Sequence, residues 1–211
     1  MDSANLPALY SFFQQAQKLK GVLRHSWVGE PAKLESSAEH TWMLCLMAVS
    51  LFHYLPTEVD QLKTLKLLII HDLAEAIAGD IPYFEEGARR DGKQAAERSA
   101  LHEMTVGITA EACQEILDLW EEFEALATPE ARVARAIDKY EALFSHAQAD
   151  IGTWDDGDYK VAFAKDDDLF AYDGFIQELK KHIDRVIYEK LKAAGTLDRL
   201  DQEYLKRYIP A

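Results

Sequence analysis

Cysteine is scarce in this 211-residue chain, and its placement excludes two classes of protein. Only Cys45 and Cys113 are present, far apart and in no C-x-x-C pair. Two separated cysteines cannot build the disulfide framework of a small secreted domain, and they do not suggest a thiolate zinc site. We expect both to be small core residues.

The chain also lacks a hydrophobic run long enough to cross a bilayer. Its longest mainly apolar stretch, residues 41–55, falls short of the about 20 residues that a membrane-spanning helix needs. The segment MDSANLPALYSFF carries an acidic residue where a secretory signal needs a basic region. We therefore expect a cytoplasmic protein with no membrane partner.

Positive charge is a third shortage. Lys and Arg number 23 against 37 Asp and Glu, which gives a formal net charge of -14. A protein of this charge repels polyanions, so we expect no nucleic-acid polymer as a partner. A small anion can still be held by a locally placed cation.

Strictly alternating runs of β-branched residues are absent, whereas apolar residues recur at three- and four-residue spacing through most of the chain. This pattern predicts an all-α fold. At 48% hydrophobic residues the chain can bury a sizeable core, so we expect one domain over residues 1–211. Thr128 before Pro129 is typical of a helix start, and Gly195 of a helix end. The predicted helices are 8–20, 37–54, 59–78, 92–105, 111–126, 129–148, 174–194 and 197–208.

Two long loops are expected, at residues 79–91 and 151–173. The second contains WDDGDY and KDDD. Acidic loops of this kind are usually solvated surface, and the oxygen-ligand spacing of an EF-hand is missing, so we do not expect calcium there.

The stretch LLIIHDLAEAIAGDI, residues 67–81, begins as an apolar run and then places His71, Asp72, Glu75 and Asp80 within ten positions. Ionisable groups on a buried helix are costly unless their desolvation is compensated. On a helix, His71 and Asp72 lie about 100° apart and can flank one ion, and Glu75 follows one turn later. Taken alone, this stretch fits equally well a core histidine hydrogen-bonded to a carboxylate.

Two further segments favour a metal site. ESSAEHTWMLCLMAV places His40 in a core-type helix, and ARAIDKYEALFSHA places Asp138 on an amphipathic helix. Two imidazoles and two carboxylates from three helices form a mixed nitrogen and oxygen set. That set suits one octahedral divalent ion, Mn²⁺, Fe²⁺, Co²⁺, Ni²⁺ or Mg²⁺, with positions open for water and substrate. Zinc is less favoured, because four protein ligands would close a tetrahedral site.

The order of these residues, His40, then the pair His71 and Asp72, then Asp138, resembles the HD-domain metal-dependent phosphohydrolase superfamily. The segments ESSAEH, HDLAEAIAGDI, LWEEFE and AIDKYEA are similar to the branch that includes bacterial 5'-deoxynucleotidases and eukaryotic HD-domain-containing 2 proteins. The string H-D-x-x-E-x-x-x-x-D is far more specific than the dipeptide alone. The resemblance implies a helical bundle around one divalent ion, hydrolysis of phosphate esters, and a homodimer.

The resemblance also assigns roles to individual residues. It makes Glu75 and Asp80 catalytic carboxylates near the scissile phosphate, and it implies four metal ligands: His40, His71, Asp72 and Asp138. One carboxylate can orient the attacking water while the other protonates the leaving ribose oxygen. We favour Glu75 as the proton donor and Asp80 as the group that orients water.

The segment KGVLRHSWVGE supplies two candidate substrate contacts. Arg24 can donate two hydrogen bonds to a phosphate, and Trp27 offers a flat surface for a base or sugar. In some bacterial members of the resembling group an Arg and a Trp near this position are adjacent, whereas here two residues separate them. The other histidines lack partner spacing typical of ligands, and we expect His25 to be exposed.

These features favour a metal-dependent phosphomonoesterase acting on nucleoside 5'-monophosphates, deoxynucleotides above all. A cyclic nucleotide or a nucleoside polyphosphate is the alternative substrate. Few cations lie near the motifs, which favours the smaller monophosphate; they are Arg24, Arg89, Arg90 and Lys139. A non-catalytic HD-type interaction domain is a third interpretation, but decay of the site would remove ligands first, and all four are present.

Overall fold

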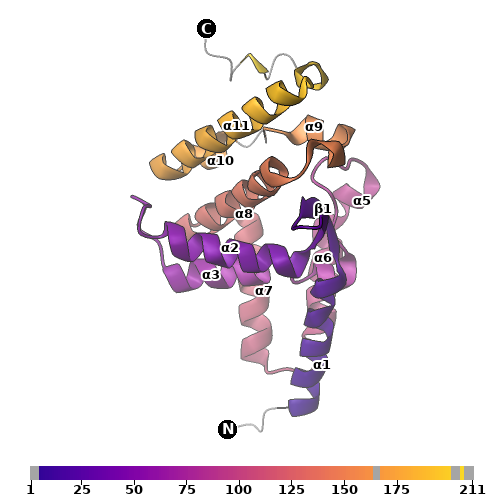
Figure 1. Cartoon of the computed structure of the whole chain (residues 1–211). Helices are drawn as coiled ribbons and strands as arrows, with labels where there is room; N and C mark the ends of the chain where they lie inside the picture. The colour runs from indigo at the N-terminus through magenta and orange to yellow at the C-terminus, as the bar shows by residue number, and fades with distance from the viewer. Residues whose placement is uncertain (1–4, 164–166, 201–204, 207–211) are drawn as a thin grey trace.

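The computed structural model describes residues 5–163, 167–200 and 205–206, and it confirms the all-α prediction (Figure 1). The α-helices in chain order are α1 (Leu6–Ala16), α2 (Ser37–Leu51), α3 (Gln61–Ile70), α4 (Glu75–Ala78), α5 (Ala88–Asp91), α6 (Lys93–Met104), α7 (Ala110–Ala125), α8 (Pro129–Gln148), α9 (Asp156–Val161), α10 (Asp167–Phe170) and α11 (Gly174–Ala194). The 3₁₀ turns are η1 (Gln17–Gly21), η2 (Ile151–Thr153) and η3 (Leu197–Arg199), and the strands are β1 (Leu23–Val28) and β2 (Lys33–Ser36).

Helix α8 is the centre of the molecule and contacts α2, α3, α7, α11 and β1. Its start is fixed as the sequence predicts: Pro129 is the first helical residue, and the Thr128 hydroxyl accepts a hydrogen bond from the Ala131 amide at 3.2 Å. Val133 and Ile137 are buried along it. The predicted bounds of this helix, 129–148, are confirmed, as are those of α11, which ends at Gly195 with a positive φ of 70°.

Two hydrophobic clusters hold the helices together. The larger cluster joins α2, α3, α8 and α11 and includes Leu44, Leu68, Ile137 and Ile187. Helix α11 lies across the top of α8 in Figure 1. The smaller cluster joins the segment after α3 to α6 and α7 and includes Leu73, Leu101 and Trp120. The residues between Leu68 and Leu73 therefore lie where the two clusters meet.

The single helix predicted over residues 59–78 is wrong, because the chain leaves α-helical geometry after Ile70. Backbone amides there donate to carbonyls three residues earlier in the chain. The Leu73 amide donates to the Ile70 carbonyl and the Glu75 amide to the Asp72 carbonyl, both at 3.0 Å. The His71 amide still donates to the Leu67 carbonyl four residues back, so the tight 3₁₀-type winding follows His71 and ends where α4 begins at Glu75. The break sits at the residues that sequence analysis singles out for chemistry.

A hairpin that the sequence does not predict precedes α2. β1 and β2 are antiparallel and are joined through Gly29, whose φ is 78°. The strands are short and carry no clean alternation of apolar and polar residues, so periodicity cannot detect them. The hairpin packs on α8 and brings residues 23–28 to the central helix.

The predicted loops hold more order than expected. Residues 79–91 include α5, and residues 151–173 include η2, α9 and α10. Asp158 and Asp173 are buried, so the acidic loop is not uniformly solvated surface. Much of the helix predicted at 197–208 lies outside the described residues; residues 197–199 form η3.

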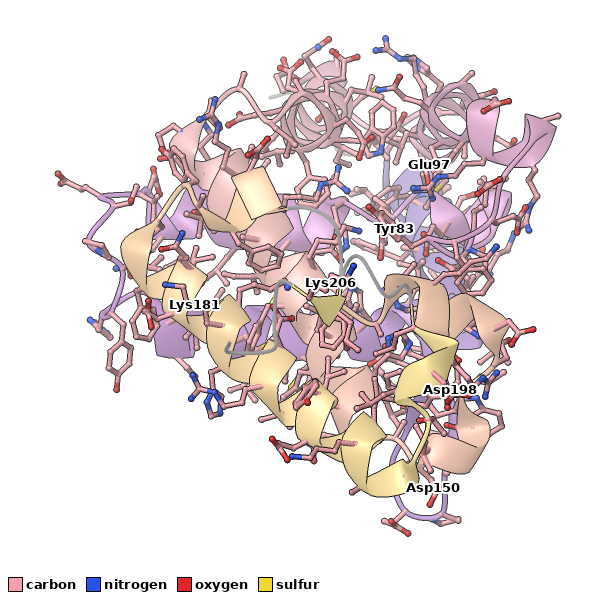
Figure 2. The ribbon with its side chains drawn as sticks, turned by 90° about the horizontal axis from the view of Figure 1, so that it is seen from above. Tyr83, Glu97, Asp150, Lys181, Asp198 and Lys206 are labelled. Atoms are coloured by element: carbon pink, nitrogen blue, oxygen red, sulfur yellow. The ribbon has the colours of Figure 1, made fainter. Side chains whose placement is uncertain are left out.

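Figure 2 looks down on α11, with Lys181 along it and Asp150 and Asp198 near its C-terminal end, whereas Tyr83 lies away from that end, toward the middle of the molecule.

Among the described residues, no helix combines the length and the apolar character that a bilayer span requires.

A buried ion pair inside α11 yields a test of how the last helix is held. The Lys180 ammonium donates to the Asp184 carboxylate at 2.6 Å and to the Phe163 carbonyl at 2.8 Å, and both charged residues are buried. Lys180→Met removes this cation from beside the buried Asp184 carboxylate, so we expect it to lower the free energy of unfolding by about 3–5 kcal/mol in urea titrations. The exposed Lys181→Met is the matched control, with an expected change of about 0.5 kcal/mol or less. Equal effects of the two substitutions would contradict this account.

Candidate metal centre

Four predicted ligands converge from three parts of the chain. His40 comes from α2, His71 and Asp72 follow α3, and Asp138 comes from α8. The His71 Nε2 to Asp72 Oδ2 distance is 3.0 Å and the His40 Nε2 to Asp138 Oδ1 distance is 3.1 Å. His40 Nε2 to Asp72 Oδ2 is 3.9 Å, and His71 Nε2 to Asp138 Oδ1 is 4.0 Å. All four residues are buried, so this is a cluster of ligand-type atoms inside the protein.

These distances fit a single octahedral cation. Ligand atoms about 2.1 Å from one ion lie about 3.0 Å apart when adjacent in an octahedron and about 4.2 Å apart when opposite. The four measured separations fall within this range. His40, His71 and Asp72 also have one ligand atom each within 4.8 Å of the others.

A backbone carbonyl three residues earlier orients the His71 ring as a ligand. Its Nδ1 lies 2.8 Å from the Leu68 carbonyl oxygen, which can only accept, so Nδ1 carries the hydrogen and Nε2 keeps its lone pair. That Nε2 is buried and has no hydrogen-bond partner. A buried acceptor without a partner is costly, and a cation at this point would satisfy it.

The sequence analysis missed Glu141, which orients His40. Its Oε2 lies 2.6 Å from His40 Nδ1, and its Oε1 accepts a hydrogen bond from the Ser145 hydroxyl at 2.8 Å. A carboxylate behind a histidine fixes the ring and strengthens Nε2 as a ligand. Glu141 follows Asp138 by three residues on α8, a spacing that places both on one helix face and that could have revealed it.

The pKa of His40 reflects this crowding of carboxylates. Burial and Arg24 disfavour its charged form, but the hydrogen bonds to Asp138 and Glu141 overcome them and raise the pKa to about 9. Burial alone would raise the pKa of Asp138, yet Lys139, His40 and His71 hold it well below its usual range. Positive charge is therefore stabilised between these groups, as a cation site requires.

The capping box at the start of α2 determines where His40 lies. Ser36 and Glu39 form a capping box at the start of α2, in which Glu39 Oε2 accepts from the Ser36 amide at 3.0 Å and Ser36 Oγ accepts from the Glu39 amide at 3.3 Å. The next residue is His40, which is completely buried. The segment ESSAEH thus combines a helix-start signal and a ligand.

Arg24 lies beside the ligands, as the sequence analysis predicts for a phosphate contact. Its Nη1 donates to Asp72 Oδ2 at 3.1 Å, and its Nε lies 3.5 Å from Glu35 Oε2. Glu35 is a second residue that the sequence analysis missed; it is buried, and its Oε2 has no hydrogen-bond partner. Burial and the neighbouring Glu141 raise the pKa of Glu35 to about 7.

Glu75 and Asp80 lie next to the ligand set. Glu75 is buried and accepts a hydrogen bond from the Ser37 hydroxyl at 2.8 Å, and Asp80 shares a hydrogen bond with Glu75. Burial, together with Asp72 and Asp80, raises the pKa of Glu75 to about 9. Burial also raises the pKa of Asp80, although Arg24 opposes this.

A cavity of about 120 Å³ opens beside these groups. Asp72 and Asp138 line it together with Glu75, Asp80 and Arg24. Further cations complete its wall; they are Arg90, Lys93, Arg135 and Lys139. Sequence analysis named Arg90 and Lys139 but missed Lys93 and Arg135, and the Arg89 guanidinium instead bonds Glu85 and the Asp80 carbonyl.

Trp27 does not line this cavity. It lines a separate cavity of about 640 Å³ with Trp42, Met43 and Phe144. The structure therefore brings Arg24, but not Trp27, to the candidate metal centre.

Comparison with known proteins agrees with this geometry. The 5'-deoxynucleotidase HDDC2 of Dictyostelium discoideum is 31% identical over 138 residues, which cover 63% of this chain and 72% of that protein. The 5'-deoxynucleotidase hdd1 of Schizosaccharomyces pombe is 28% identical over 149 residues, covering 68% and 73%.

A solved structure extends the match to nearly the whole chain. The predicted metal-dependent phosphohydrolase of Magnetospirillum magnetotacticum MS-1 is 27% identical, with a TM-score of 0.77 over 93% of this chain and 96% of that one. The model of the HD domain family matches residues 16–174, which contain all four candidate ligands. The chain therefore belongs to the HD domain family.

Proposed function

We propose that this protein is a metal-dependent phosphohydrolase that releases phosphate from deoxynucleoside 5'-monophosphates. One observation carries the proposal: a small cavity is lined at once by two metal-ligand carboxylates, by Glu75 and Asp80, and by cations. Relatives at 28–31% identity that bear the name 5'-deoxynucleotidase support the substrate class.

His40, His71, Asp72 and Asp138 would hold one divalent ion. Mixed imidazole and carboxylate donors suit Mn²⁺, Fe²⁺, Co²⁺, Ni²⁺ or Mg²⁺. Such an ion, when bound, lowers the pKa of a coordinated water and neutralises phosphate charge. The protein's own groups then position the phosphate and move the protons.

Arg24 and Lys139 would bind the phosphate oxygens. Arg24 reaches Asp72, and Lys139 Nζ lies 3.6 Å from Asp138 Oδ2, so both cations border the ligand carboxylates from the cavity side. A guanidinium can donate two parallel hydrogen bonds to a phosphate. We assign the main phosphate contact to Arg24.

Glu75 and Asp80 would divide the proton transfers between them. Two carboxylates that share a hydrogen bond in a buried site favour one proton between them. Glu75 is the more buried, and its raised pKa favours the protonated form that a leaving ribose oxygen needs. Asp80 would then orient the attacking water.

The size and charge of the cavity favour a single phosphate. Its about 120 Å³ is well below the roughly 300–1,000 Å³ of small-molecule pockets, so it fits a phosphoryl group while the nucleoside faces the 79–91 loop. Two of the further cations in its wall are already paired: Lys93 Nζ lies 2.7 Å from Glu97, and Arg135 Nη2 lies 2.6 Å from Glu124. Beyond Arg24 and Lys139, which would bind the first phosphate, Arg90 is then the lining cation left for a polyphosphate tail.

A cytoplasmic homodimer remains our proposal for the assembly. Exposed apolar side chains lie along α2 at Trp42, Leu46 and Val49, a surface that an identical subunit could cover. The spacing of these residues places them on one helix face.

The substrate assignment predicts a positional preference. We expect deoxynucleoside 5'-monophosphates to be hydrolysed faster than 3'-monophosphates, cyclic nucleotides or triphosphates, because only a terminal 5'-phosphate places its sugar toward residues 79–91. Arg24→Ala should lower kcat/KM about ten- to a hundredfold, mainly through KM, since it removes a charged hydrogen bond worth about 1.5–3 kcal/mol. Phosphate release from a nucleotide panel with each divalent ion measures both effects.

Arg98→Ala is the matched control, because Arg98 is exposed, pairs with Glu121 and does not line the cavity. Its kinetics should equal those of the wild type. Equal rates on 5'- and 3'-monophosphates, or a preference for cyclic nucleotides or polyphosphates, would overturn the substrate assignment.

Ligands and proton-transfer groups should separate by mutation. Asp72→Ala should reduce bound metal, because it removes a ligand, whereas Glu75→Ala should keep the metal and lower kcat by about 10² to 10⁴. Metal content by elemental analysis, measured beside turnover for each variant, tests the contrast. Equal loss of metal from both variants would make Glu75 a ligand and remove it from proton transfer.

A further inference from the structure

A second group of ligand-type side chains borders the cavity and shares no residue with the centre described above. It consists of His25 from β1 and of Asp155 and Asp158 at the start of α9, and His146 from α8 lies beside it. His25 and His146 also line the cavity. Neither these histidines nor these aspartates have a role in the proposed hydrolysis.

Each aspartate uses one oxygen locally and leaves the other for the histidines. Asp155 Oδ1 caps α9 by accepting from the Gly157 amide at 2.7 Å, and Asp158 Oδ2 accepts from the Asp155 amide at 2.8 Å. Asp155 Oδ2 lies 3.2 Å from His25 Nε2. Asp158 Oδ1 lies 3.5 Å from His25 Nε2 and 3.3 Å from His146 Nε2. His146 Nε2 also lies 3.4 Å from the His25 carbonyl oxygen, which can only accept, so this nitrogen carries a hydrogen and is a donor, not a metal ligand.

The atoms that face one another are buried and unsatisfied. The Asp158 side chain is 4% exposed, and its Oδ1 has no hydrogen-bond partner. His25 Nε2 is likewise buried without a hydrogen bond. These two unsatisfied atoms are directed at one point, and the Asp158 side chain is already fixed by the α9 cap, so a further group between them would satisfy both.

The separations match tetrahedral coordination. Ligands about 2.0–2.1 Å from a zinc ion lie about 3.3–3.4 Å apart in a tetrahedron, and His25 Nε2 lies 3.2 Å from Asp155 Oδ2 and 3.5 Å from Asp158 Oδ1. His25, Asp155 and Asp158 have ligand atoms within 4.8 Å of one another. We propose that these three residues form a second metal site, which binds Zn²⁺ with a water as the fourth ligand.

The site would fasten α9 over the cavity. Its ligands join β1 to the start of α9, two elements that are far apart in the sequence. Phe84 of the 79–91 loop packs on the same point: its ring lies 4.9 Å from the His25 ring, and a Cβ on Gly157 would come within 2.5 Å of it. A zinc ion there would hold this wall rigid while the first centre keeps its open positions for chemistry.

Cobalt binding tests the proposal without measuring turnover. After chelator treatment, the full chain is titrated with Co²⁺, which absorbs visible light strongly in tetrahedral sites and weakly in octahedral ones. We expect two ions per chain, with an intense band from one of them, and competition with Zn²⁺ should remove that band. His25→Gln and Asp158→Asn should each abolish the intense band and weaken binding of that ion at least about a hundredfold.

Asp158→Asn keeps an oxygen for the α9 cap, and His53→Gln is an exposed histidine control that should leave both ions and the band unchanged. Asp138→Ala should lose only the weakly absorbing ion, so failure of the first centre is distinguishable from failure of the second. An ion count and a spectrum that are the same in wild type, His25→Gln and Asp158→Asn would overturn the second site. So would a wild-type chain with no intense band.

Discussion

The concentration of buried negative charge around His40 governs the rest of this structure. Glu35, Asp72, Glu75, Asp138 and Glu141 are all buried within one region, and Arg24 is the guanidinium placed among them. Burying carboxylates without compensation costs several kcal/mol each, so the region needs more positive charge than one arginine supplies. The raised pKa of His40 shows the same demand. The divalent cation that we propose between two imidazoles and two carboxylates would supply this positive charge.

Local backbone structure positions each candidate ligand in this buried, negatively charged region. The capping box of α2 places His40 one residue beyond Glu39, and His71, at the end of α3, is oriented by the bond from its Nδ1 to the Leu68 carbonyl. Asp138 and Glu141 lie one turn apart on α8, so one helix supplies both a ligand and the carboxylate behind His40. The centre sits where the two hydrophobic clusters meet, and both hold it in place.

Local signals in the sequence predicted local features well. The bounds of α8 and α11 followed from Pro129 and Gly195, and the types and order of His40, His71, Asp72 and Asp138 led us to expect that these four residues come together. The helix break after Ile70 could not be predicted, because the apolar run continues through it and the 3₁₀ winding depends on what His71 and Asp72 face. Lys93 and Arg135 line the cavity because of how the helices pack, and the spacing of apolar residues in the sequence does not predict that packing. The same holds for His25 and Asp158, which no spacing connects.

The account rests on the claim that a divalent cation stabilises the fold through these four ligands, and the stability of the protein with and without metal tests it most directly. Chelator-treated protein is unfolded thermally with and without Mn²⁺ at about one hundred times its Kd, where binding to the folded state alone contributes about 2.7 kcal/mol. The account predicts a higher Tm with Mn²⁺ for the wild type and for Asp158→Asn, and no rise for Asp138→Ala. An unchanged Tm in the wild type, or an equal rise in Asp138→Ala, would contradict it.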